Sequence, residues 1–97
     1  MSLVPQIKFH PFDKWDVDFV GPINPPTKRT GAWYIITKTD YLTRWVEGAP
    51  VVDSTVATTT RFLFENIVTR FGCPRILMSD QGSHFINRTI RALMEEL

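Results

Sequence analysis

The chain contains little cysteine, little histidine and almost no excess charge. Its one cysteine, Cys73, has no intramolecular disulfide partner. One cysteine and the chain's two histidines are too few for a zinc module of Cys and His ligands. Eleven Lys and Arg against ten Asp and Glu leave a net charge of +1, which excludes a strongly basic or acidic tail. No apolar run approaches the length of a membrane span, and no secretory signal is recognisable, so we expect a reduced, intracellular setting with no membrane partner.

The composition is that of one small folded domain. The chain has 97 residues, 43% of them hydrophobic and 12% aromatic, with no repeat and no low-complexity tract. Residues 4–12 contain two prolines, Pro5 and Pro11, and show no hydrophobic period. We therefore expect residues 1–10 to be an extended lead-in, whose first residues resemble an added start. Residues 11–97 form the domain.

Three segments have the residue types of β-strands, with turn residues between them. Gly48, Ala49 and Pro50 are expected to end the third of these strands. Consecutive strands with short connections predict an antiparallel meander. The three segments are 15–20, 33–37 and 43–47. Each contains one tryptophan, for which core packing is favoured over base stacking: Trp15, Trp33 and Trp45.

The hydrophobic period then lengthens to that of helices. A helix capped by Asp53 or Ser54 is expected to end near Phe71, before a short apolar strand at 75–79 that is covered on both faces. A second amphipathic helix, capped by Asn87, should run to the end of the chain. A helical crossover normally returns the chain parallel to a strand already in the sheet. The predicted fold is therefore α/β, with a three-stranded antiparallel meander, a parallel fourth strand and flanking helices.

Two aspartates would meet in this topology. Asp18 lies on the first strand and Asp80 follows the fourth, at the sheet edge where α/β proteins bind ligands. Two close carboxylates repel unless a cation such as Mg²⁺ neutralises them, and paired metal ions of this kind catalyse phosphoryl transfer. Aspartates on solvated strand faces or in turns are also common. Asp16 shares a face with Asp18, so the strand period alone cannot distinguish the two.

The order of three motifs carries a resemblance. Together they resemble the catalytic core of retroviral and long-terminal-repeat retrotransposon integrases, and most closely the Ty3/gypsy class. The resemblance covers the chain from about Pro11 to Leu97. The motifs are Pro11-Phe12-x-x-Trp15-x-x-Asp18-Phe19-x-Gly21-Pro22, Asp40-Tyr41-Leu42-Thr43-Arg44-Trp45 and Ser79-Asp80-Gln81-Gly82-Ser83-x-Phe85.

The resemblance implies an RNase H-like fold and a metal-dependent enzyme acting on DNA. Mg²⁺ or Mn²⁺ would be the cofactor, and the reactions would be trimming of the element's 3′ ends and strand transfer into target DNA. Asp18 and Asp80 match the first two catalytic, metal-binding aspartates, whereas Asp16 matches no catalytic position. Ser83 matches a position near target DNA. DNA ends and target DNA would be the partners in a homo-oligomer, with no small-molecule substrate, and integration would take place in the nucleus.

The third acidic residue of the family is absent. A glutamate is expected roughly 35 residues after the second aspartate, near position 116, and a two-metal site lacks a ligand without it. Glu95 and Glu96 come too early to replace it. The last helix also stops without a cap, so we expect a truncated, inactive part of a catalytic core. Two alternatives stay open: a non-catalytic, integrase-derived module that binds protein or DNA, and a different RNase H-like nuclease.

Overall fold

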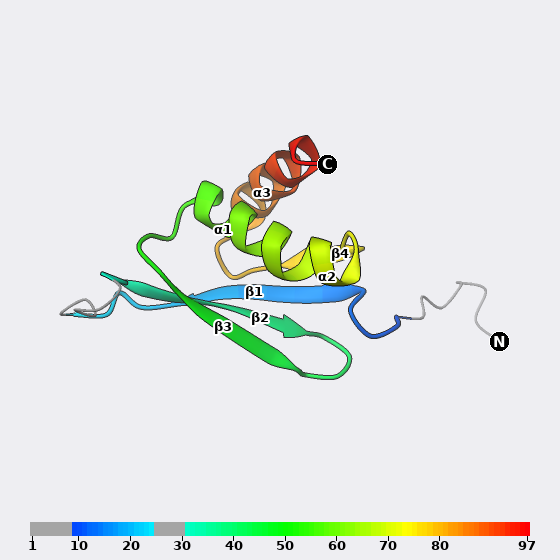
Figure 1. Cartoon of the computed structure of the whole chain (residues 1–97), viewed down its shortest axis with the longest axis horizontal. Coiled ribbons are helices and arrows are strands. Elements are labelled where there is room, and N and C mark those ends of the chain that lie inside the picture. The colour runs from blue at the N-terminus through cyan, green and yellow to red at the C-terminus, as the bar shows by residue number, and fades with distance from the viewer. Residues whose placement is uncertain (1–8, 25–30) are drawn as a thin grey trace.

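A computed structural model describes residues 9–24 and 31–97 as a four-stranded sheet with helices (Figure 1). The strand order is β3-β2-β1-β4, with β1–β2 and β2–β3 antiparallel and β4 parallel to β1. This confirms the predicted α/β class and the return of the fourth strand beside the first. Most of the predicted lead-in lies outside the described residues. The elements are β1 (Lys14–Val20), β2 (Tyr34–Asp40), β3 (Val46–Val51), α1 (Val56–Leu63), η1 (Phe64–Val68), α2 (Thr69–Phe71), β4 (Ile76–Met78) and α3 (Ser83–Glu95).

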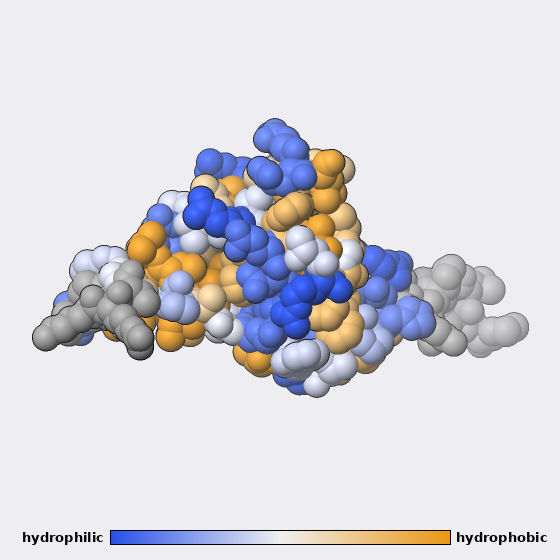
Figure 2. All heavy atoms as spheres, viewed as in Figure 1, coloured by the Kyte–Doolittle hydropathy of each residue, from blue (hydrophilic) through white to orange (hydrophobic). Residues whose placement is uncertain are grey.

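The helices cover one face of the sheet (Figure 1). Along β1, Trp15 and Val17 are buried, while the alternating Lys14, Asp16 and Asp18 are only half-buried. This period of two places the apolar side chains under the helices and the polar ones on the opposite face, which we call the open face. The core consists of Trp15, Val17, Ile36, Phe62, Leu63, Ile67 and Leu93. Hydrophilic side chains gather over α1 on the outer surface (Figure 2).

Several predicted boundaries were wrong. The third strand begins at Val46 and continues through Gly48 and Pro50, because β3 is an edge strand and tolerates a proline that cannot donate a ladder hydrogen bond. Neither Asp53 nor Ser54 caps α1. Instead, the Thr55 side chain accepts a hydrogen bond from the backbone N–H of Thr58.

The last helix also begins earlier than expected. It starts at Ser83 rather than after Asn87, because Gly82 turns the chain with φ of 94° and Phe85 in the first turn contacts Phe19 edge-on, with ring centroids 6.4 Å apart. β4 is half-buried along its length rather than covered on both faces, since the helices lie on one side only. No helix of the described residues is long and apolar enough to cross a membrane.

Only one of the three tryptophans lies in the core. Trp15 is 2% exposed, whereas Trp33 is 42% and Trp45 is 48% exposed. The prediction of core packing was therefore wrong for two of them. Trp33 precedes β2 and Trp45 precedes β3, so neither belongs to the central strand that the helices cover.

A buried lysine joins the sheet to the helical layer. The Lys38 side chain is 1% exposed, and its Nζ pairs with Glu47 at 2.7 Å and donates to the Asn66 carbonyl at 2.6 Å. The same ammonium lies 4.9 Å from the Trp15 ring centroid. Asn66 belongs to η1, a π-helical segment, so Lys38 contacts the helix where its hydrogen bonding is irregular.

We expect Lys38→Met to destabilise the fold by about 2 kcal/mol, because the Asn66 carbonyl and Glu47 would lose a charged donor. Arg70→Met is the matched control. Arg70 pairs with the same carboxylate at 2.8 Å but has a side chain that is 40% exposed, so its loss should cost less than about 1 kcal/mol. Urea unfolding measures both values, and an equal cost for the two variants would contradict the assigned role of Lys38.

A second buried charge organises the turn between β2 and β3. Asp40 is fully buried and accepts hydrogen bonds from the backbone N–H groups of Phe12 and Thr43, at 2.8 Å each, and from the Thr43 hydroxyl at 2.6 Å. Burial by itself would raise the pKa of Asp40, but these hydrogen bonds outweigh it and hold the pKa below its usual value. Asp40 and Thr43 of the second motif therefore hold the turn together.

Because the folded-state pKa of Asp40 is lowered, its stabilising contribution is present above the unfolded pKa, near 3.9, and is lost as the pH falls through the folded value. We expect Asp40→Asn to lower the unfolding free energy at neutral pH by about 2 kcal/mol and to flatten the acid limb between about pH 5 and pH 2. Thermal unfolding across that range tests this. Glu47 and Asp53 also have lowered pKa values and should preserve part of the slope. If Asp40→Asn left the fall of stability at acid pH unchanged, the stabilising role assigned to the Asp40 carboxylate would be contradicted.

Candidate active site

The parallel pairing of β1 with β4 brings Asp18 and Asp80 together. The ladder aligns Lys14 with Ile76 and Asp16 with Met78, and the same register continued two residues further aligns Asp18 with Asp80. The backbone N–H of Asp80 donates to Oδ1 of Asp18 at 3.2 Å. Two residues that are distant in the chain thus meet at the carboxyl ends of neighbouring strands, as the sequence predicted.

The Asp18 side chain belongs to the open face, because it alternates with the buried side chain of Val17. Its own main-chain carbonyl accepts a hydrogen bond from Thr37 Oγ1, at 3.4 Å across the β1–β2 ladder. Asp18 is half-buried and Asp80 is exposed. The carboxylate on the strand is thereby held by the sheet, while the one after β4 is open to solvent.

No basic side chain neutralises these acids within the described ranges 9–24 and 31–97. The ion pairs found there join Lys38 and Arg70 to Glu47, and Arg75 to Asp13. Close carboxylates without a basic partner attract a cation, because their mutual repulsion is otherwise uncompensated. Two acidic residues without a basic partner thus lie at this strand edge.

The turn after β4 places the remaining residues of the third motif. Gln81 Nε2 donates to Asp80 Oδ1 at 3.4 Å, and the Gln81 backbone N–H donates to the Ser79 hydroxyl at 3.2 Å. Ser83, predicted to lie near target DNA, is exposed at the first position of α3. The contact of Gln81 with Asp80 was not anticipated, although its place beside Asp80 in a turn was a signal for it.

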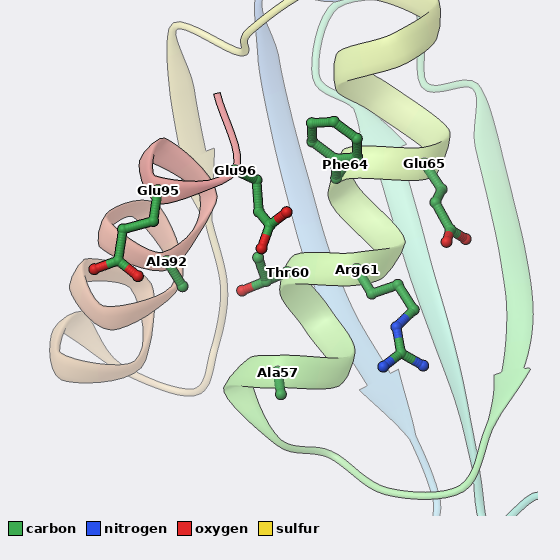
Figure 3. Close-up of a pocket in the computed structure, with 8 residues that line it drawn as sticks. All are labelled: Ala57, Thr60, Arg61, Phe64, Glu65, Ala92, Glu95 and Glu96. Carbon is green, nitrogen blue, oxygen red and sulfur yellow. The ribbon is translucent and has the colours of Figure 1, made fainter.

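A cavity between α1 and α3 lies apart from this strand edge. A hollow of about 390 Å³ separates α1 from α3, and its lining includes neither Asp18 nor Asp80. Thr60 and Glu96 both line it, whereas Arg61 and Glu95 point away on opposite sides (Figure 3). Its charged side chains do not converge on one point. An active-site cleft should hold convergent polar groups, so the strand edge is the better candidate.

The sequence agrees with this geometry when it is compared with known families. The family model of the integrase core domain matches residues 9–97, which include every described strand and helix. The chain belongs to the integrase core domain family.

Retroviral and transposon polyproteins are similar to this integrase core domain. It is 34% identical over 83 residues to the Gag-Pol polyprotein of woolly monkey sarcoma virus, covering 86% of the chain. It is 32% identical over 87 residues to the Gag-Pol polyprotein of avian reticuloendotheliosis virus, covering 90% of the chain. It is 27% identical over 88 residues to the retrovirus-related Pol polyprotein from transposon 412 of Drosophila melanogaster, covering 91% of the chain. The chain spans only 5–7% of the length of these relatives.

Integrase core domains generally use divalent metal ions, and the residues present fit part of such a site. Mg²⁺ is commonly held by one or two carboxylates together with water and substrate phosphates. Asp18 and Asp80 supply two carboxylates of this kind at one strand edge. Within the part of the chain that the structure describes, no group of three or more His, Cys, Asp or Glu residues forms a complete metal site.

We expect Asp18→Asn and Asp80→Asn each to weaken Mn²⁺ binding about tenfold or more, because each removes one anionic oxygen ligand. Isothermal titration calorimetry of the 97-residue chain measures this. Asp16→Asn is the matched control, since Asp16 lies on the same strand and face but pairs with Met78 rather than aligning with Asp80. Equal losses in all three variants would show general charge attraction instead of a defined pair of ligands.

Proposed function

We propose that this integrase core domain carries two of the catalytic carboxylates of a polynucleotidyl transferase that processes DNA 3′ ends and joins them to target DNA. The hydrogen bond from the Asp80 N–H to Asp18 Oδ1, at 3.2 Å, is the observation that carries this proposal. It supports a site in which two acidic side chains act on the same substrate phosphate. Family membership supports DNA as that substrate.

In this proposal the chain's own residues position charge. Asp18 pairs with Thr37 in the β1–β2 ladder and accepts the Asp80 N–H on its other side, so its carboxylate is preorganised. Asp80 stands at the start of a turn, where Gln81 donates to its carboxylate. Divalent ions bound at the two carboxylates would activate the attacking oxygen and stabilise the leaving oxygen of a phosphodiester. Ser83, exposed next to this turn, would lie beside the target strand.

The proposal assigns activity to the parent enzyme and not to these 97 residues alone. A third carboxylate, expected roughly 35 residues after Asp80, would complete the metal ligands. We therefore expect no strand transfer by this chain by itself. Mg²⁺ or Mn²⁺ would serve as cofactor, the parent enzyme would act as a homo-oligomer, and integration would occur in the nucleus, where target DNA lies.

The test measures strand transfer of labelled element-end DNA by the parent enzyme with Mn²⁺. We expect Asp18→Asn and Asp80→Asn each to reduce the rate by at least about a thousandfold while thermal unfolding stays close to that of the unaltered protein. Asp16→Asn should keep most of the activity, because Asp16 does not align with Asp80. Substantial strand transfer by either of the first two variants would overturn the assignment.

A parallel assay separates a nuclease from an integrase. The parent enzyme should act on duplex DNA that carries the element's end sequence and should leave RNA–DNA hybrids of the same sequence intact. Cleavage of the hybrid in preference to the DNA end would instead identify an RNase H-like nuclease.

A further inference from the structure

Two cations meet on one aromatic ring at the far end of the open face. Lys14 Nζ lies 4.0 Å from the centroid of the Tyr41 ring, and Arg44 Cζ lies 5.1 Å from the same centroid. Tyr41 is 40% exposed, and Arg44 is exposed. We call these three residues the Tyr41 cluster. Two like charges held around one ring favour an anionic partner.

The cluster shares its face of the sheet with the candidate active site. Lys14 and Asp18 are four residues apart on β1, so their side chains leave the strand on the same side. At about 3.3 Å per residue they are separated by about 13 Å along the strand. The Tyr41 N–H donates to the Lys14 carbonyl at 2.9 Å, which continues the β1–β2 ladder and places Tyr41 beside Lys14.

No carboxylate of the described residues pairs with either cation. Asp40, the nearest acid along the chain, is buried and occupied by hydrogen bonds from Phe12 and Thr43. Asp13 pairs with Arg75. Asp16, between Lys14 and Asp18 on the open face, is the acid on β1 that lies nearest to Lys14 on that face and opposes an anion there. The positive charge of the cluster therefore remains available for an external anion.

The turn presents Arg44 in a fixed conformation. Arg44 has φ of 66°, a left-handed value that residues other than glycine and asparagine seldom adopt. Its N–H donates to the Asp40 carbonyl at 2.8 Å, and the hydrogen bonds of Asp40 to Thr43 brace the same turn. A strained backbone that persists under such restraint is typical of residues with a function. The turn thus fixes the backbone of Arg44, from which the guanidinium reaches the Tyr41 ring.

We propose that the Tyr41 cluster binds the phosphodiester backbone of DNA whose reacting phosphate lies at Asp18 and Asp80. A separation of about 13 Å corresponds to about four base steps along a duplex, so the cluster would contact the same DNA a short distance from the reaction. Lys14 and Arg44 would each neutralise a phosphate without reading sequence. This inference rests on the proposed function, because it takes the DNA substrate from there.

The test measures how the affinity of the 97-residue chain for duplex DNA depends on salt concentration. Binding is measured by fluorescence anisotropy with a labelled 20-base-pair duplex in EDTA. The logarithm of the binding constant falls linearly with the logarithm of the salt concentration, and each lost phosphate contact makes this slope less steep by about one. We expect Lys14→Gln and Arg44→Asn each to make the salt slope less steep by about one, and to do so equally for duplexes of unrelated sequence. Asparagine at position 44 accepts the left-handed backbone, and matched thermal unfolding checks that both variants fold.

Two further variants sharpen the result. Arg61→Gln is the control, because Arg61 is an exposed arginine on α1, on the helical side of the sheet, and its loss should leave the slope unchanged. Asp16→Asn should tighten binding by removing the opposing charge. An unchanged slope in Lys14→Gln and Arg44→Asn, an equal fall in Arg61→Gln, or no duplex binding by the unaltered chain would each overturn the inference.

The outcomes also separate this inference from the proposed function. DNA binding in EDTA needs no bound metal. If the two cluster variants had a less steep salt slope, but Asp18→Asn and Asp80→Asn did not weaken Mn²⁺ binding, the proposed active site would be rejected and the DNA contact of the Tyr41 cluster would stand. An unchanged slope with Mn²⁺ binding that depends on both aspartates would do the reverse. Poly-glutamate serves as a probe for an acidic protein partner. If Lys14→Gln and Arg44→Asn lost binding to poly-glutamate but kept their binding to DNA, the partner would be an acidic protein and the proposal would be overturned.

Discussion

The in-register parallel ladder between β1 and β4 is the constraint on which the site depends. Only three residue pairs form it, yet they align positions 62 residues apart in the sequence. Such a non-local pairing costs chain entropy before any contact forms. The crossover through α1, η1 and α2 meets that cost by packing Phe62, Leu63 and Ile67 on the sheet. A shift of one residue in this register would move Asp80 to the opposite face from Asp18.

The two faces of the sheet have separate tasks. On the helical side, Trp15 and Val17 pack into the core, and Lys38 fastens β2 to η1 through the Asn66 carbonyl. On the open side, β1 carries Lys14, Asp16 and Asp18 in a row, with Asp80 joining at its end. Because alternate residues of one strand face opposite ways, a single seven-residue strand both packs into the core and carries charged side chains on the open face.

Burial of charge in this small domain serves the architecture rather than catalysis. Asp40 and Lys38 are its buried ionisable side chains in the described ranges, and each is satisfied by several partners. Asp40 fixes the turn that presents Tyr41 and Arg44, and so couples a structural hydrogen-bond network to an exposed cationic surface. The acids proposed to act on substrate are instead accessible at a strand edge. That arrangement agrees with their task, since a ligand must reach them.

Local pattern alone was enough for the existence and type of the elements. The alternation of Trp15, Val17 and Phe19, the spacing of Leu63 and Ile67, and the glycine and proline positions predicted strand, helix and crossover, and motif order identified Asp18 and Asp80 as a pair. The strands, helices and crossover follow from backbone periodicity, which each segment carries by itself. The choice of Asp18 over Asp16 came instead from the resemblance to integrases, because the strand period cannot distinguish the two. Tertiary structure decided the rest: the continuation of β3 through Pro50 at a sheet edge, the start of α3 at Ser83, the exposure of Trp33 and Trp45, and the meeting of Lys14 with Arg44 on one ring. Those outcomes depend on which neighbour covers each position, and burial and charge contacts between distant segments exist only once the sheet has formed.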